Sequence, residues 1–119
     1  MYRTRKTGSQ GEQLVVDKLL SEGYEIVARN YSRPYGEIDI IAKSAHELLF
    51  VEVKTRYNPL FDPIEQISRS QQKRIVTVAK HFLATHTGAD NVICRFDVAL
   101  VITQQGTTSI SYLANAFTE

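Results

Sequence analysis

Charged side chains interrupt two apolar stretches that follow each other closely in this 119-residue chain. Asp39 stands among isoleucines in residues 37–42, and Glu52 and Lys54 stand in the otherwise apolar residues 47–54. Carboxylate oxygens are the ligands that Mg²⁺ prefers, and Mg²⁺ keeps coordination positions for water and phosphate oxygens. A nearby lysine can orient or help to deprotonate a water molecule, or stabilise negative charge on a phosphate. The three residues outline a site for phosphodiester hydrolysis.

The two stretches are predicted to be β-strands, and the short connection 43–46 predicts an antiparallel hairpin. In the register that this loop implies, Asp39 lies opposite Phe50. Alternation of side chains then puts Asp39, Glu52 and Lys54 on one face of the hairpin. Asp39 and Glu52 become diagonal neighbours about 7 to 8 Å apart at the backbone, a gap that two carboxylates close around a divalent cation.

A competing interpretation is that these charges form an ordinary solvent-exposed face. A glutamate and a lysine two positions apart on an alternating strand are often exposed to water. The apolar neighbours of Asp39 and Glu52 favour a buried functional pair instead.

Glu12 allows two interpretations that do not exclude each other. It is the fourth residue of a Ser-Gln-Gly-Glu sequence that starts at Ser9, which has the spacing of a helix capping box. It also precedes Val15, Val16 and Leu19 at helical intervals, so it lies on the face that must pack on the sheet. In the second case it reaches the hairpin acids as a third carboxylate.

The remaining pattern predicts an α/β fold with helices on a mixed, mainly antiparallel five-stranded sheet, in a single domain over residues 1–119. Helical periodicity ends at glycines, and β-rich segments are separated by turn residues. The predicted helices are 9–22 and from 68 or 70 to 86, and the further strands are 24–31, 91–102 and 107–113.

The net charge of +1 hides two segments with Lys and Arg but no Asp or Glu, residues 3–6 and 66–86. They suit a polyanion such as nucleic acid, or a solvated helix face. One cysteine, Cys94, excludes an intrachain disulfide, and it is expected to be a small buried apolar residue. The chain starts without an apolar signal, and its longest apolar run, 98–102, is far below the roughly 20 residues that span a bilayer. We therefore expect a cytoplasmic protein that does not enter the membrane.

Four motifs carry a resemblance to a known family: Gly11-Glu12, residues 36–42, residues 50–56 and residues 95–98. Together they resemble the YraN-type family of small bacterial endonuclease-like proteins. More distantly, the chain is similar to archaeal Holliday-junction resolvases and to the PD-(D/E)xK nuclease superfamily. The resemblance extends from about residue 8 to residue 117, and the order Glu, Asp, Glu-x-Lys is its most specific part.

The resemblance implies a restriction-endonuclease-like core that uses Mg²⁺ or Mn²⁺. Asp39, Glu52 and the carbonyl of Val53 would bind the metal, Lys54 would be the catalytic lysine, and Glu12 would assist the metal or its water. A related exonuclease branch has a glutamine on the following helix. Gln71 matches it only loosely, because Ile75 stands where a tyrosine is expected, so Gln71 is not counted as catalytic. The loop 58–64 lacks the glycine that the family has there.

Other charged residues have simpler expected roles. Arg56, just beyond the strand that bears Lys54, is expected to contact a phosphate, and Arg69 and Lys73 could do so from the second helix. Arg95 and Asp97 share one face of an apolar strand and are expected to form an internal ion pair.

The leading hypothesis is a metal-dependent nuclease that acts on DNA, with branched DNA implied by the resemblance. A second is a nucleic-acid-binding or scaffold domain that keeps the fold without cutting, and a third is a metal-binding regulatory module. A homodimer is expected by analogy, because a four-way junction has two symmetric scissile positions.

Overall fold

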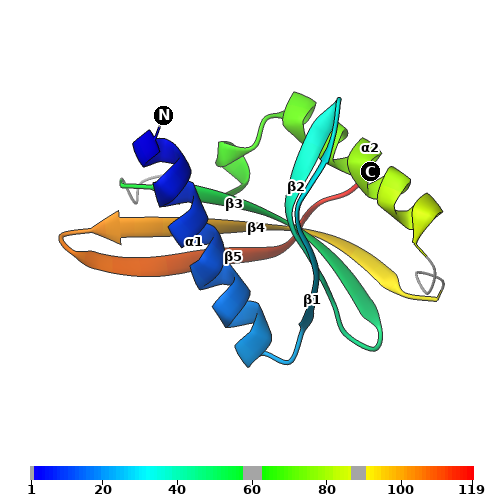
Figure 1. Cartoon of the computed structure of the whole chain (residues 1–119), viewed down its shortest axis with the longest axis horizontal. Helices are drawn as coiled ribbons and strands as arrows, with labels where there is room; N and C mark the ends of the chain where they lie inside the picture. Colours follow the sequence, from blue (N-terminus) through cyan, green and yellow to red (C-terminus); the bar gives the residue numbers. More distant parts are fainter. Residues whose placement is uncertain (1, 58–62, 87–90) are drawn as a thin grey trace.

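The computed structural model describes residues 2–57, 63–86 and 91–119, with side chains from residue 10 onward except those of Pro63 and Glu65. The elements follow the predicted order and form the α/β fold that the sequence indicates (Figure 1). They are α1 (Tyr2–Ser21), β1 (Glu25–Arg33), β2 (Gly36–Lys43), β3 (Glu47–Arg56), the 3₁₀ helix η1 (Pro63–Gln66), α2 (Arg69–Thr85), β4 (Ile93–Gln104) and β5 (Thr107–Phe117). None of the described helices is long and apolar enough to cross a membrane.

The five strands form one sheet in the order β1-β2-β3-β4-β5. Only β3 and β4 are parallel, and the other three neighbouring pairs are antiparallel, so the sheet is mixed and mainly antiparallel as predicted. The parallel pair needs a long crossover, which η1 and α2 supply. The arrangement is that of a restriction-endonuclease-like core.

Each helix buries an apolar stripe against its own face of the sheet. Val15, Val16 and Leu19 of α1 pack on residues such as Leu49 and Val51. On the other face, α2 buries Ile75, Val78 and Phe82 against Ile41, Phe50 and Val98. Side chains therefore alternate along β3 between the α1 layer and the α2 layer, and Glu52 belongs to the α2 layer.

The sheet divides into two arms beyond the pairs at its centre. The β2–β3 ladder extends only from Lys43–Leu48 to Ile40–Val51. Beyond that point β2 stays paired with β1, and β3 stays paired with β4. We call this divergence the fork. In Figure 1 the end of the β1–β2 hairpin points away from the ribbon of β3, β4 and β5. Asp39 and Glu52 are the first residues beyond the last β2–β3 pair, so they stand at the base of the fork.

The predicted register of the β2–β3 hairpin was wrong by two residues. Phe50 pairs with Ile41 and not, as the loop length predicts, with Asp39. The turn is tighter than the predicted loop, because the N–H of Ser44 donates to the carbonyl of Glu47 at 2.9 Å. A shift of two residues keeps every side chain on its predicted face. Asp39 consequently moves from a diagonal position to one level with Glu52.

Some predicted boundaries also need correction. Helix α1 begins at Tyr2, so Ser9 lies inside the helix and cannot be its N-cap, which removes the capping interpretation of Glu12. The Arg, Lys and Gln residues of this first part are good helix formers, which accounts for the extension. Strand β5 runs to Phe117, past a positive φ of 54° at Asn115. Cys94 is exposed rather than buried, because it lies next to the start of β4 at the margin of the sheet.

Candidate active site

Two carboxylates meet in a pocket at the base of the fork. Asp39 from β2 is 8% exposed and Glu52 from β3 is 7% exposed. The pocket has a volume of about 180 Å³ and opens beside α2. Its lining consists of Gly36, Glu37, Asp39, Glu52, Gln71, Arg74 and Ile75. The burial of both acids rules out the interpretation that they form a solvent-exposed face.

Asp39 is held by the backbone of the neighbouring strand. The N–H of Val53 donates to Oδ2 of Asp39 at 2.8 Å. The Asp39 side chain thus accepts a hydrogen bond from β3 just beyond the last backbone pair of the β2–β3 ladder. Burial, followed by the negative charge of Glu52, raises the pKa of Asp39 from 3.8 to about 8. Burial also raises the pKa of Glu52, although Lys54 opposes this effect. Such a pair is more stable when it shares a proton or a cation than when both groups carry bare charges.

Glu52 receives two further contacts on one oxygen. Nε2 of Gln71 donates to Oε2 of Glu52 at 2.7 Å, and Nζ of Lys54 lies 3.3 Å from the same oxygen. The Lys54 side chain is 21% exposed; it contacts Glu52 but is not among the residues that line the pocket. These contacts fix the orientation of the Glu52 carboxylate.

Gln71 is a site residue that sequence reasoning passed over. Ser68 caps α2 by accepting from the N–H of Gln71 at 3.1 Å, which places Gln71 in the first turn and above the sheet. The resemblance to the exonuclease branch contained the signal, because that branch has a glutamine on this helix. Because Ile75 replaces the tyrosine that accompanies this glutamine, the sequence did not assign Gln71 to the site.

Glu12 approaches the same acids from α1. A Cβ atom on Gly11 would lie 2.5 Å from Oγ1 of Thr55, so only glycine lets the helix pack this closely on β3. Glu12 is half-buried, and burial followed by the charge of Asp39 raises its pKa, whereas Arg29 and a hydrogen bond with Asn30 lower it. Glu12 is not among the residues that line the pocket. Within the described part of the chain, no three Asp, Glu, His or Cys side chains form a ready-made metal cage.

The three predicted nucleic-acid contacts differ in their surroundings. Arg56 is half-buried and donates from Nε to Oε1 of Gln66 at 2.7 Å, which ties β3 to η1. Arg69 and Lys73 are exposed on α2. Of the loop 58–64, which lacks the family's glycine, residues 58–62 lie outside the described residues, and residues 63 and 64 begin η1.

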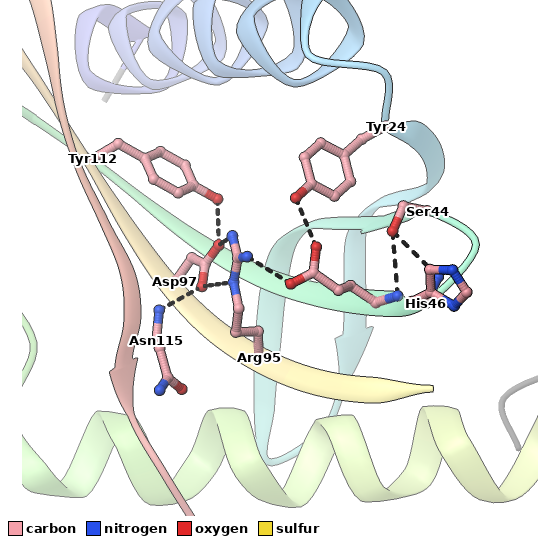
Figure 2. A network of polar contacts seen from close by, with 8 residues as sticks. Tyr24, Ser44, His46, Arg95, Asp97, Tyr112 and Asn115 are labelled. Carbon is pink, nitrogen blue, oxygen red and sulfur yellow. Dashed lines mark hydrogen bonds and ion pairs between the residues drawn. The ribbon is translucent and has the colours of Figure 1, made fainter. Parts of the chain in front are cut away.

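A second ionic network lies on the opposite face of the sheet, beneath α1 (Figure 2). Asp97 is fully buried and accepts four hydrogen bonds, two from the Arg95 guanidinium, one from the Tyr112 hydroxyl at 2.6 Å and one from the N–H of Asn115 at 2.9 Å. The expected pairing of Arg95 with Asp97 is thereby confirmed.

The same network extends to β3 and to the connection between α1 and β1. Arg95 also donates to Glu47 at 2.9 Å, and Glu47 accepts from the hydroxyl of Tyr24 at 2.9 Å. The network thus joins the connection between α1 and β1, the start of β3, and strands β4 and β5. Because both carboxylate oxygens of Asp97 are bonded to donors of the protein itself, this network is structural.

Comparison with known proteins agrees with this architecture. The profile of the Uncharacterised protein family UPF0102 matches residues 11–101. A UPF0102 protein from Desulfosudis oleivorans is 44% identical over 118 residues, covering 98% of this chain and 94% of the relative. Another, from Thermosynechococcus vestitus, is 43% identical over 118 residues, covering 96% and 95%.

Among solved structures, Hjc, a Holliday junction resolvase from Archaeoglobus fulgidus, superposes with a TM-score of 0.54 at 20% identity. The match covers 89% of this chain and 75% of the resolvase. At this level of identity the likeness establishes a common fold.

Proposed function

Since the chain belongs to the Uncharacterised protein family UPF0102, whose name states no activity, we propose from its own site that it is a metal-dependent nuclease. The reaction would be hydrolysis of phosphodiester bonds in nucleic acid. One observation carries this proposal: two buried carboxylates, Asp39 and Glu52, line one pocket, and the ammonium group of Lys54 lies 3.3 Å from Oε2 of Glu52.

The donor set fits a hard divalent cation. Asp39 and Glu52 are adjacent, are oxygen donors and have raised pKa values, so a cation between them would relieve their repulsion. With the carbonyl of Val53, they would hold Mg²⁺ or Mn²⁺ and leave positions for water and phosphate oxygens. When bound, the cation would lower the pKa of a water molecule and offset the charge of the phosphate.

The protein residues have separate roles in this proposal. Lys54 would orient the attacking water, help remove its proton, or neutralise charge that grows on the phosphate. Gln71 would act as a positioning residue, because its hydrogen bond fixes the Glu52 carboxylate. Glu12, whose pKa is raised by burial and then by the charge of Asp39, would hold a water or a proton at the edge of the same site.

We further propose structured or branched DNA as the substrate. The supporting observation is the common fold with a Holliday junction resolvase. A homodimer would suit such a substrate, because two symmetric sites match the two scissile positions of a four-way junction. We expect Arg56, Arg69 and Lys73 to contribute to DNA binding, and the protein to work in the cytoplasm.

The test is a cleavage assay on four-way-junction, flap, single-stranded and duplex DNA with Mg²⁺ or Mn²⁺. Lys54→Ala should reduce the cleavage rate by at least about 100-fold while DNA binding in Ca²⁺ persists. Lys43→Ala is a matched control, because Lys43 is exposed on β2 and pairs with Glu25 outside the pocket. If wild type cuts no substrate yet binds DNA in a salt-dependent way, the protein is a non-catalytic nucleic-acid-binding module.

A further inference from the structure

The α2 wall of the pocket carries a guanidinium group that takes no part in the proposed metal site. Arg74 lines the pocket together with three acids, Glu37, Asp39 and Glu52. A pocket with only acids would repel a phosphodiester, even with one divalent cation bound. The position of Arg74 therefore bears on how the substrate anion is accepted.

The guanidinium of Arg74 uses only one of its N–H donors in a hydrogen bond with the described residues. Its Nη1 donates to Oγ of Ser70 at 2.7 Å, one turn earlier on α2, and the side chain is exposed. The ion pairs of the described residues do not include Arg74. Lys54, by contrast, is already paired with Glu52, and Arg56 is bonded to Gln66. Among these three cations, Arg74 alone lines the pocket, and its guanidinium keeps N–H donors for new charge-assisted hydrogen bonds.

The backbone at Arg74 is fixed against the start of β2. A Cβ on Gly36 would lie 3.3 Å from Cβ and 3.4 Å from the carbonyl oxygen of Arg74, so glycine allows the strand to pack directly on the helix. This packing involves atoms that every residue at position 74 except glycine possesses. The guanidinium can therefore be changed while the packing is kept.

We propose that Arg74 binds a non-bridging oxygen of the scissile phosphodiester, on the side of the pocket formed by α2. A guanidinium matches the geometry of two phosphate oxygens through parallel N–H donors, which a lysine ammonium cannot do. The phosphate would lie between the carboxylate pair with its cation and Arg74. This inference rests on the proposed nuclease function and identifies the group that the substrate anion meets.

The experiment compares Arg74→Gln and Arg74→Lys with Lys80→Gln. Lys80 lies on the same helix but pairs with Glu119 at 2.6 Å and does not line the pocket. Single-turnover cleavage in Mg²⁺ uses a four-way junction with either a normal phosphodiester or a methylphosphonate at the position that wild type cuts. Melting temperatures check that each variant is folded.

On the normal junction, Arg74→Gln should slow cleavage by about 10- to 100-fold, Arg74→Lys by less, and Lys80→Gln by less than about twofold. On the methylphosphonate junction, the difference between wild type and Arg74→Gln should fall to about twofold or less, because the charged oxygen is gone. An equal loss on both junctions, or cleavage by Arg74→Gln at the rate of Lys80→Gln, would overturn the inference.

A wild type that cuts nothing would refute the nuclease proposal, and the affinity for the junction in Ca²⁺ then decides about Arg74. Binding by Arg74→Gln that is at least about tenfold weaker than binding by Lys80→Gln supports phosphate recognition. Equal affinities contradict it.

Discussion

Nε2 of Gln71 donates a hydrogen bond to Oε2 of Glu52 at 2.7 Å, so the first turn of α2 holds a carboxylate that belongs to β3. The orientation of Glu52 thus depends on a helix that follows β3 in the sequence. Residues that orient a metal-binding group from behind contribute to metal affinity without touching the metal.

Gln71→Ala should weaken Mn²⁺ binding by about 10-fold, because the Glu52 carboxylate loses its orienting donor. Isothermal titration with Mn²⁺ measures the affinity. Gln72→Ala is the control, since its side chain donates to the carbonyl of Ile67 and not to the pocket. An unchanged Mn²⁺ affinity in Gln71→Ala would show that the hydrogen bond has no role in the site.

The metal-free protein should lose stability as pH rises. The folded state holds the Asp39 proton up to about pH 8, whereas an ordinary carboxyl releases it near 3.8. The folded protein therefore binds more protons than the unfolded chain in this window, and the free energy of unfolding decreases with increasing pH. Urea unfolding in EDTA at several pH values between about 4 and 8 measures this slope.

Asp39→Asn should flatten the same slope, and Mg²⁺ should raise the stability of wild type at about pH 8 but not that of Asp39→Asn. Asp17→Asn is a suitable control, because Asp17 is exposed on α1 and pairs with Gln13. A slope that survives in Asp39→Asn would mean that another group binds the extra proton.

Gly11→Ala should destabilise the protein by about 1 to 3 kcal/mol, because the new Cβ would lie 2.5 Å from Oγ1 of Thr55. Thr55→Val should be neutral or stabilising, since Oγ1 of Thr55 is buried and has no hydrogen-bond partner among the described residues. Thermal unfolding of both variants tests the pair. A destabilisation of more than about 1 kcal/mol by Thr55→Val would reveal a partner for this hydroxyl.

Neutralising Arg69 and Lys73 together should reduce the salt dependence of DNA binding. Each is exposed on α2, and each phosphate that the protein no longer binds lowers the slope of log affinity against log salt concentration by about 1. Fluorescence anisotropy in Ca²⁺ at several salt concentrations gives the slope. If the double variant keeps the wild-type slope, the DNA follows another surface.

Asp97→Asn should destabilise the fold by about 3 kcal/mol or more, because the Arg95 guanidinium loses its buried counter-charge. Tyr112→Phe removes a single hydrogen bond to Asp97 and should lose about 1 kcal/mol. Both residues lie on the face opposite the pocket, so folded Asp97→Asn should bind Mn²⁺ with wild-type affinity. Reduced affinity in the folded variant would connect the two faces.

The predictable features were those that depend on local pattern. Alternation along the strands assigned Asp39, Glu52 and Lys54 to one face, and that assignment survived a two-residue error in register because the side-chain period of a strand is two. The tight turn that closes at Ser44 had no unambiguous sequence signal, so the register itself was not predictable.

Contacts between residues from distant segments could not be predicted from the sequence pattern. Gln71 is 19 residues from Glu52, and Arg95 is 48 residues from Glu47. Such pairs depend on how α2 crosses over the sheet and on how β4 aligns with β3. The sequence indicated that Arg95 and Asp97 share a face, but it did not indicate Tyr112 as their partner.

The alternation of charged and aromatic residues on β4 has a consequence for folding. Asp97 points to its four donors beneath α1. Its neighbour Phe96 lies on the other face and stacks between Phe50 and Phe117, with ring-centroid distances of 5.4 and 5.2 Å. If β4 shifted by one residue, the carboxylate of Asp97 would lie among phenylalanine rings, and the ring of Phe96 would lie among charged groups. Folding intermediates with a shifted β4 are therefore strongly disfavoured. The same two residues thus help to fix the register between β4 and β3.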